Sequence, residues 1–140
     1  MSDRVFLDTN IFVYTFDLNA PAKAAMAASL IRSALQSQNG FISYQVVQEF
    51  FNVALRRFAQ PMSAADAVQY LGTVLRPMLR IHSSQALFAE ALNVKASAGL
   101  SWFDSIIVAS ALQAGCTRLL TEDLQHGRRI GSLCIENPFL

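Results

Sequence analysis

Short apolar runs alternate with helical segments along the chain, and this alternation constrains the fold more than any other feature of the sequence. The runs at residues 4–7, 41–42, 79–82, 118–120 and 133–135 have the length and composition of buried strands, the last being the weakest. The segments between them carry helical periodicity or capping residues, at residues 11–17, 21–38, 44–58, 63–76, 84–98 and 103–114. Strands that alternate with helices predict an α/β fold with a mainly parallel sheet of four to five strands.

Composition excludes several classes of protein. Hydrophobic residues make up 53% of the 140 residues and charged residues 15%, which excludes a disordered chain. The longest apolar-rich run without a charge, residues 105–117, is well short of the roughly 20 residues that span a bilayer. Because there is no repeat, linker or low-complexity segment, residues 1–140 are expected to form a single domain. The amino terminus has no signal-peptide pattern and the two cysteines lack metal-site spacing, so we expect a cytoplasmic protein with reduced thiols.

Acidic residues follow two of the predicted strands at the point where each strand ends. Asp8 comes directly after the first strand, and Glu122 and Asp123 follow the fourth. Ligands bind at the carboxyl ends of parallel strands, where the strand order reverses, so Asp8 and Asp123 converge if these two strands are neighbours. Both motifs also have a structural interpretation, since Asp8 can cap a helix and residues 121–123 can form a turn.

Two further acids lie on predicted helices. Asp104 is in the first turn of residues 103–112, which are apolar on nearly every side. A carboxylate on a buried helix costs several kcal/mol unless it is paired, hydrogen-bonded or bound to a metal, although Ser101-x-x-Asp104 also matches a capping box. Glu49 lies on a polar stripe of its helix, which is either a solvated face or the lining of a groove above the sheet edge.

These motifs follow one another in a characteristic order. The order is a strand with Asp8-Thr9-Asn10, the helical Glu49, Trp102-Phe103-Asp104-Ser105-Ile106, and a strand with Thr121-Glu122-Asp123. Over essentially the whole chain, this order resembles the PIN-domain nucleases, and specifically the VapC toxins of bacterial toxin–antitoxin pairs. The resemblance implies a PIN-like three-layer sandwich, in which helices flank the sheet on both sides.

The resemblance also implies a metal site, and carboxylate oxygens are the ligands that hard divalent cations prefer. The implied catalytic and metal-binding acids, which would hold Mg²⁺ or Mn²⁺, are Asp8, Glu49, Asp104 and Asp123. The residues implied to support them are Thr9, Asn10, Thr121 and Glu122. The family pattern Thr-x-Asp favours Asp123 as the fourth acid, with Glu122 as the alternative ligand.

The activity implied by the resemblance is metal-dependent endonucleolytic hydrolysis of RNA, which leaves a 5′-phosphate and a 3′-hydroxyl. The implied partners are the RNA substrate, a small VapB-like antitoxin that inhibits the site, and a second copy in a homodimer; no membrane is implied. Two arginine pairs, Arg56-Arg57 and Arg128-Arg129, are candidates for gripping phosphates beside the acids. Solvated arginines at a helix end and in a loop are the alternative.

Two other function classes remain open. A haloacid-dehalogenase-like phosphatase also places Asp after the first strand, but its chemistry wants a second Asp at the position of Asn10. A PIN-like scaffold that only binds RNA or protein would be expected to lose acids, and here all four are present.

Overall fold

Six short strands form one sheet in the computed structural model, which describes residues 3–140. The strands are β1 (Val5–Leu7), β2 (Gly40–Ser43), β3 (Leu79–Ile81), β4 (Arg118–Leu120), β5 (Arg129–Ile130) and β6 (Leu133–Glu136). All five predicted strands are present, and the sheet has one strand more than expected. The additional strand β5 has only two residues and pairs antiparallel with β6, so it is too short for a pattern in the sequence to reveal it.

Helices occupy the segments between the strands, close to their predicted limits. They are α1 (Thr9–Tyr14), α2 (Pro21–Ser37), α3 (Tyr44–Ala54), α4 (Ala64–Tyr70), α5 (Gln85–Ala98) and α6 (Trp102–Gln113), and a π-helical turn, η1 (Leu71–Leu75), extends α4. The α3 helix ends four residues before its predicted end at residue 58. Three serines cap helices as the sequence indicates, because the Oγ atoms of Ser63, Ser84 and Ser101 each accept from a backbone amide in the following turn.

The strand order places β1 and β4 side by side. The order in the sheet is β3-β2-β1-β4-β6-β5, and every pair except β5–β6 is parallel. From β1 the chain first builds the sheet in one direction, through β2 and β3, and then returns to add β4 on the other side. Leu7 pairs with Leu120, so the residues that follow these two strands emerge together at the carboxyl edge. The condition for the convergence of the first and fourth strand ends is therefore met.

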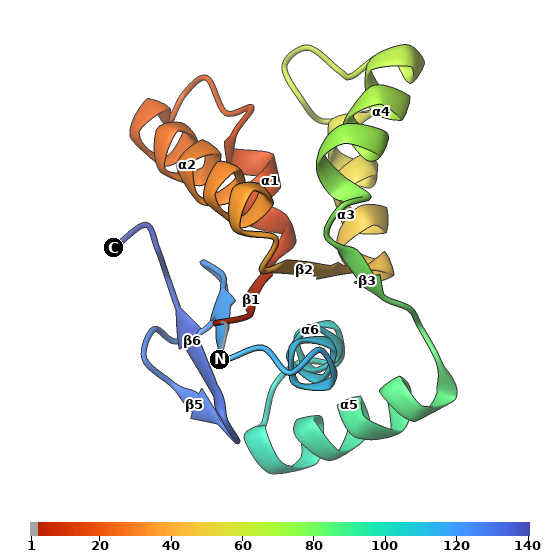
Figure 1. Ribbon diagram of the computed structural model, residues 1–140, viewed down its shortest axis with the longest axis vertical. Coiled ribbons are helices and arrows are strands. Elements are labelled where there is room, and N and C mark those ends of the chain that lie inside the picture. Colours follow the sequence, from red (N-terminus) through yellow and green to blue (C-terminus); the bar gives the residue numbers. More distant parts are fainter. Residues whose placement is uncertain (1–2) are drawn as a thin grey trace.

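Helices cover both sides of the sheet, which gives the predicted three layers. In Figure 1, α1 to α4 lie on one side of the strands, and α5 and α6 lie on the other. The α6 helix is the inner member of the second layer, and its residues from Ser105 to Ala111 are all buried. Large side chains fill the core on the first side, among them Phe12 and Phe50, which are fully buried. No helix within residues 3–140 is long and apolar enough to cross a membrane.

Candidate active site

Asp8 lies at the carboxyl end of β1 and is the most deeply buried of the predicted site acids, with 4% of its surface exposed. Its Oδ1 accepts from the backbone nitrogen of Thr9 at 2.7 Å, and its Oδ2 accepts from Thr121 Oγ1 at 2.8 Å. Burial raises the pKa of Asp8 to about 7 against the effect of these hydrogen bonds, and the negative charges of Asp123 and Glu49 raise it further. Asp8 is thus both the cap of α1 and a carboxylate in an acidic environment.

Asp123 follows β4 and lies on the solvent-facing rim of the same site. Its Oδ2 accepts from Asn10 Nδ2 at 3.2 Å, and its backbone nitrogen donates to Thr121 Oγ1 at 3.1 Å. Protein atoms on its inner side desolvate the carboxyl group, and this desolvation, with the charges of Asp104 and Glu122, raises the pKa of Asp123. Asn10 and Thr121 therefore connect the ends of β1 and β4.

Glu49 and Asp104 reach the site from helices on opposite sides of the sheet. Glu49 Oε1 accepts from Thr9 Oγ1 at 2.8 Å, which joins α3 to α1. Asp104 lies in the first turn of α6, where its backbone nitrogen donates to Ser101 Oγ at 3.2 Å. Since the charge of Glu49 acts on Asp8 and the charge of Asp104 acts on Asp123, the four predicted acids form one electrostatic cluster at the carboxyl edge.

Glu122 faces away from this cluster, although it is adjacent to Asp123 in the sequence. Its Oε2 lies 2.6 Å from Lys23 Nζ of α2, and its Oε1 accepts from the hydroxyl of Tyr14. The hydrogen bond from Lys23, followed by the one from Tyr14, lowers the pKa of Glu122. Phe139 packs edge-on against Tyr14 with ring centroids 5.0 Å apart, which ties the C-terminal segment to the same place. Glu122 is occupied by a structural ion pair, and Asp123 is the acid that faces the cluster.

A cavity of about 450 Å³ opens above the acids between α1 and α3. Four predicted site residues line it, namely Thr9, Asn10, Glu49 and Asp123. The rest of the lining comes from α1 and α3 and consists of Val13, Tyr14, Asn52 and Val53. A second cavity of about 450 Å³ shares Val13 and Val53 with the first, and Arg57 contributes to its wall. The two cavities are therefore adjacent, with Val13 and Val53 in the wall of both, and together they are called the furrow below.

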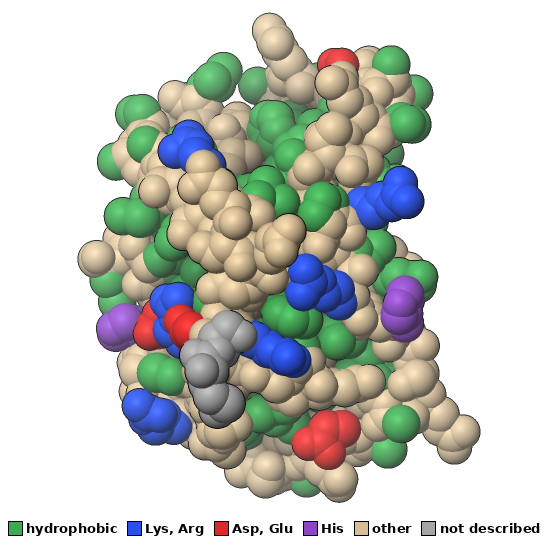
Figure 2. Space-filling view, viewed as in Figure 1, with side chains coloured by type: hydrophobic (Ala, Val, Ile, Leu, Met, Phe, Trp, Pro, Cys, Tyr) green, Lys and Arg blue, Asp and Glu red, His purple; other side chains and the backbone are tan. Residues whose placement is uncertain are grey.

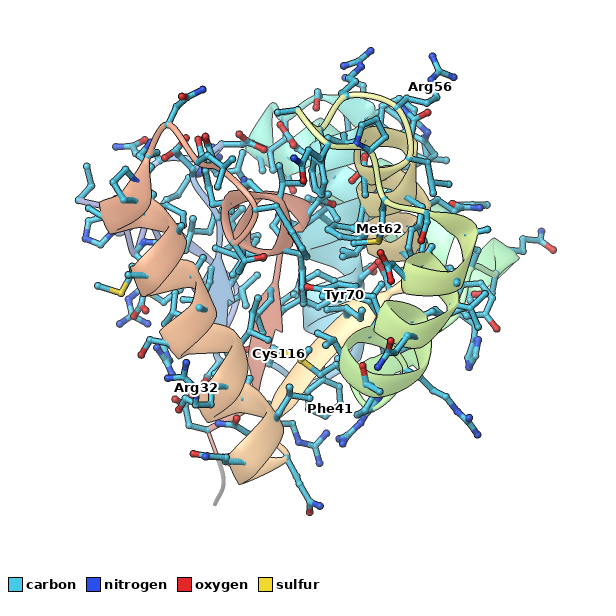
Figure 3. All side chains as sticks on the ribbon, turned by 90° about the horizontal axis from the view of Figure 1, so that it is seen from above. Arg32, Phe41, Arg56, Met62, Tyr70 and Cys116 are labelled. Atoms are coloured by element: carbon cyan, nitrogen blue, oxygen red, sulfur yellow. The ribbon has the colours of Figure 1, made fainter. Side chains whose placement is uncertain are left out.

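The predicted arginine pairs lie in different surroundings. Arg57 lines the furrow, whereas Arg56 lies at the outer edge of the molecule and points away from it (Figure 3). Arg128 donates from Nη2 to the carbonyl oxygen of Ala98 at 2.6 Å, at the end of α5. Arg129 pairs with Cys134 of β6, which in turn pairs with Arg118, the first residue of β4. Arg129 therefore lies at the end of β4 opposite to the carboxyl edge. Basic side chains on the face in Figure 2 are spread over the surface rather than gathered into one patch. Of these four arginines, Arg57 is the one that lines the furrow beside the acids.

The donor set of the cluster fits a hard divalent cation. Asp8 accepts a hydrogen bond from the buried hydroxyl of Thr121 and Asp123 accepts one from the amide of Asn10, while Glu49 and Asp104 add negative charge to the same edge. Carboxylate and hydroxyl oxygens are ligands that Mg²⁺ and Mn²⁺ prefer. Within residues 3–140, no three acidic, histidine or cysteine side chains stand close enough together to hold an ion among them. Mg²⁺ usually takes only one or two carboxylates directly and keeps several waters, so the donor set suits a hydrated ion rather than a closed protein cage.

Lys23 and Tyr14 carry no signal in the sequence, and Gln45 carries only a weak one. Gln45 donates from Nε2 to the carbonyl oxygen of Phe103 at 3.2 Å, and Lys23 and Tyr14 hold Glu122. Each of these contacts joins residues that are far apart in the chain. The polar stripe of α3 was the single available indication, because Gln45 lies one helical turn before Glu49 on the same face.

The sequence matches a known protein-family model over most of its length. The family model described as the PIN domain matches residues 5–130. A comparison with curated protein sequences found no match. Among solved structures, a toxin–antitoxin complex from Klebsiella pneumoniae is 20% identical with a TM-score of 0.67, over 96% of this chain and 97% of that one.

Two other solved structures are similar over most of their length. VapBC2 from Rickettsia felis, bound to a DNA fragment from its promoter, is 20% identical with a TM-score of 0.62, over 95% of this chain and 97% of that chain. VapC20 of Mycobacterium tuberculosis, described as a toxin that cleaves the sarcin–ricin loop, is 18% identical with a TM-score of 0.59, over 82% and 86%. At such identities the likeness establishes the fold, and the family model covers most of the sequence. This chain belongs to the PIN-domain family.

Proposed function

We propose that this protein is a metal-dependent endoribonuclease that hydrolyses RNA phosphodiester bonds. The observation that carries the proposal is the electrostatic cluster of Asp8, Glu49, Asp104 and Asp123, which come from four separate parts of the chain. Membership of the PIN-domain family supports the same activity, since proteins of this fold generally use divalent ions. An acidic cluster alone repels RNA, and a bound cation removes that repulsion.

The residues of the cluster have separate roles in this proposal. Asp8, Glu49, Asp104 and Asp123 would together hold a hydrated Mg²⁺ or Mn²⁺, which would supply a more acidic bound water and stabilisation of negative charge on the scissile phosphate. Thr121 fixes the Oδ2 atom of Asp8, and Thr9 fixes the Oε1 atom of Glu49. Asn10 holds Asp123 on the rim through its amide group. These neutral donors orient the carboxylates without adding charge to the site.

We further propose that the enzyme acts as a toxin that a small antitoxin protein neutralises. The solved structures with a similar fold include a toxin–antitoxin complex and a VapBC assembly, and this likeness supports the proposal. The homodimer that the family resemblance implies is part of the same proposal. Expression of the chain should arrest growth, and co-expression of the small protein encoded next to it should restore growth. Arrest that persists with an Asp8→Asn chain would separate toxicity from RNA cleavage.

The experiment that tests the enzyme is RNA cleavage by the purified chain with Mg²⁺, with Mn²⁺ and with excess EDTA. Cleavage with either ion, its loss in EDTA, and products with 5′-phosphate and 3′-hydroxyl ends are the expected results. Asp8→Asn and Asp104→Asn should abolish cleavage, whereas Glu90→Gln, which changes an exposed acid on α5, should leave it intact. Full activity in EDTA or in the two site variants would contradict the proposal, and RNA binding without cleavage would favour a scaffold.

A further inference from the structure

The second residue of α3, Gln45, connects the helices that carry two of the site acids. Its side chain is buried, with 9% of the residue exposed. One amide nitrogen, Nε2, lies 3.2 Å from the carbonyl oxygen of Phe103 in the first turn of α6 and 3.4 Å from Glu49 Oε2. A single primary amide therefore links α3 to the first turn of α6.

The two acids depend on this amide to different degrees. Glu49 is held on both oxygens, because Thr9 donates to Oε1 and Gln45 lies next to Oε2. Within residues 3–140, the carboxylate of Asp104 makes no hydrogen bond, whereas its backbone nitrogen donates to Ser101 Oγ. The position of the Asp104 carboxylate is thus set by the placement of the first turn of α6, which is where Gln45 donates.

The chemistry of Gln45 indicates that the side chain serves more than packing. Its Oε1 is buried and has no hydrogen-bond partner in the described part of the chain, so the fold carries the desolvation cost of that atom. A methionine of similar shape would fill the same space without this cost. In return, the site gains two hydrogen-bond donors on one nitrogen, because a primary amide can donate to the Phe103 carbonyl and to the Glu49 carboxylate together.

We infer that Gln45 is a positioning residue that sets the separation of Glu49 and Asp104 and thereby the affinity of the site for its divalent cation. The inference rests on the proposed metal site and extends it to a residue that binds no metal itself. Residues that orient metal ligands typically change metal affinity about 10- to 100-fold when they are replaced. Loss of the amide should therefore weaken cation binding without removing any carboxylate.

The test is calorimetric titration of the purified chain with MnCl₂ in the absence of RNA. Gln45→Met, which keeps the shape and removes both donors, should weaken Mn²⁺ binding at least about tenfold. Gln48→Met is the matched control, since Gln48 is exposed on the same helix, and it should bind Mn²⁺ as the wild type does. Gln45→Asn provides a second variant that keeps the donors but shortens their reach, so its affinity should also fall.

Two further measurements distinguish positioning from a structural role. Without cation, Gln45→Met should unfold at as high a temperature as the wild type. RNA cleavage by this variant should recover at high Mn²⁺ concentration. A stability loss with unchanged Mn²⁺ affinity would overturn the inference and leave the proposed function standing. A wild-type chain that neither binds Mn²⁺ nor cleaves RNA would overturn both.

Discussion

Replacement of the buried acid Asp8 by asparagine should stabilise the cation-free protein while it abolishes activity. Asp8 ionises with a pKa of about 7 in the folded state, against 3.8 when unperturbed, because burial and neighbouring charges disfavour its charged form. A rise of about three units corresponds to about 4 kcal/mol between the two protonation states. Asparagine has no charge to desolvate, and it can still accept from the amide of Thr9.

The sign of the pH dependence follows from proton binding. Between about pH 4 and pH 7 the folded state retains the proton on Asp8 and the unfolded state has lost it. The stability of the cation-free wild type should therefore fall as the pH rises through this window and level off above it. Between pH 5 and pH 8, the contribution of Asp8 to this fall is about 2–3 kcal/mol, with relaxation of the site favouring the lower figure.

Urea unfolding of the wild type and of Asp8→Asn in EDTA, at several pH values from 5 to 8, measures this difference. The difference between the free energies of unfolding of the two proteins should widen with pH in favour of the variant, and the titration of groups that do not interact with Asp8 cancels in the comparison. Mg²⁺ at pH 8 should restore stability to the wild type and have little effect on Asp8→Asn. Parallel curves for the two proteins, or equal stabilisation of both by Mg²⁺, would refute the reasoning about Asp8.

Three other predictions concern packing, RNA contact and capping. Gly40→Ala should lower the free energy of unfolding by about 1–3 kcal/mol in urea titrations, because the new methyl group would lie 2.7 Å from Ala34 Cβ. An unchanged urea midpoint would mean that α2 can shift away from this methyl group at no energetic cost. Arg57→Ala should weaken RNA binding, and the slope of the logarithm of the binding constant against the logarithm of salt concentration should become shallower by about 0.7. Arg56→Ala should change neither quantity. Equal effects of the two substitutions would exclude the furrow as the path of the RNA. Ser101→Ala should cost about 1 kcal/mol of stability through the lost cap of α6, and thermal unfolding that is unaltered would show that the cap contributes nothing.

The layout of the fold could be predicted from the sequence because its determinants are local. Apolar runs that end in polar residues identified the strands and the edge where Asp8 and Asp123 meet, and the serine caps located the starts of three helices. The two-residue strand β5 could not be predicted, since its pairing depends on β6 rather than on its own composition. The early end of α3 and the π-helical turn after α4 likewise left no mark in the sequence pattern.

The site was predictable as a set of acids but not as a geometry. Sequence alone could not separate Glu122 from Asp123, because the separation is made by Lys23, a residue of α2 on a distant part of the chain. The contact of Gln45 with the backbone of α6 spans 58 residues and depends on how two helices cross the sheet edge. Local patterns indicate which residues are available, and tertiary packing decides which of them face one another. The roles of the acids as metal ligands and catalysts stay a prediction that the proposed assays test.

The central position of β1 has a consequence for when the protein acquires its chemistry during synthesis. Asp8 leaves the ribosome well before its hydrogen-bond partner Thr121, which lies 113 positions later, and before the neighbouring strand β4. Since domains generally fold as units once enough of the chain has emerged, a nascent chain carries an incomplete site until β4 and Thr121 have been synthesised. For the proposed ribonuclease, which is itself made on the RNA-containing ribosome, this order of events would separate synthesis from activity. A ribosome-bound chain arrested before Arg118 should accordingly bind no Mn²⁺.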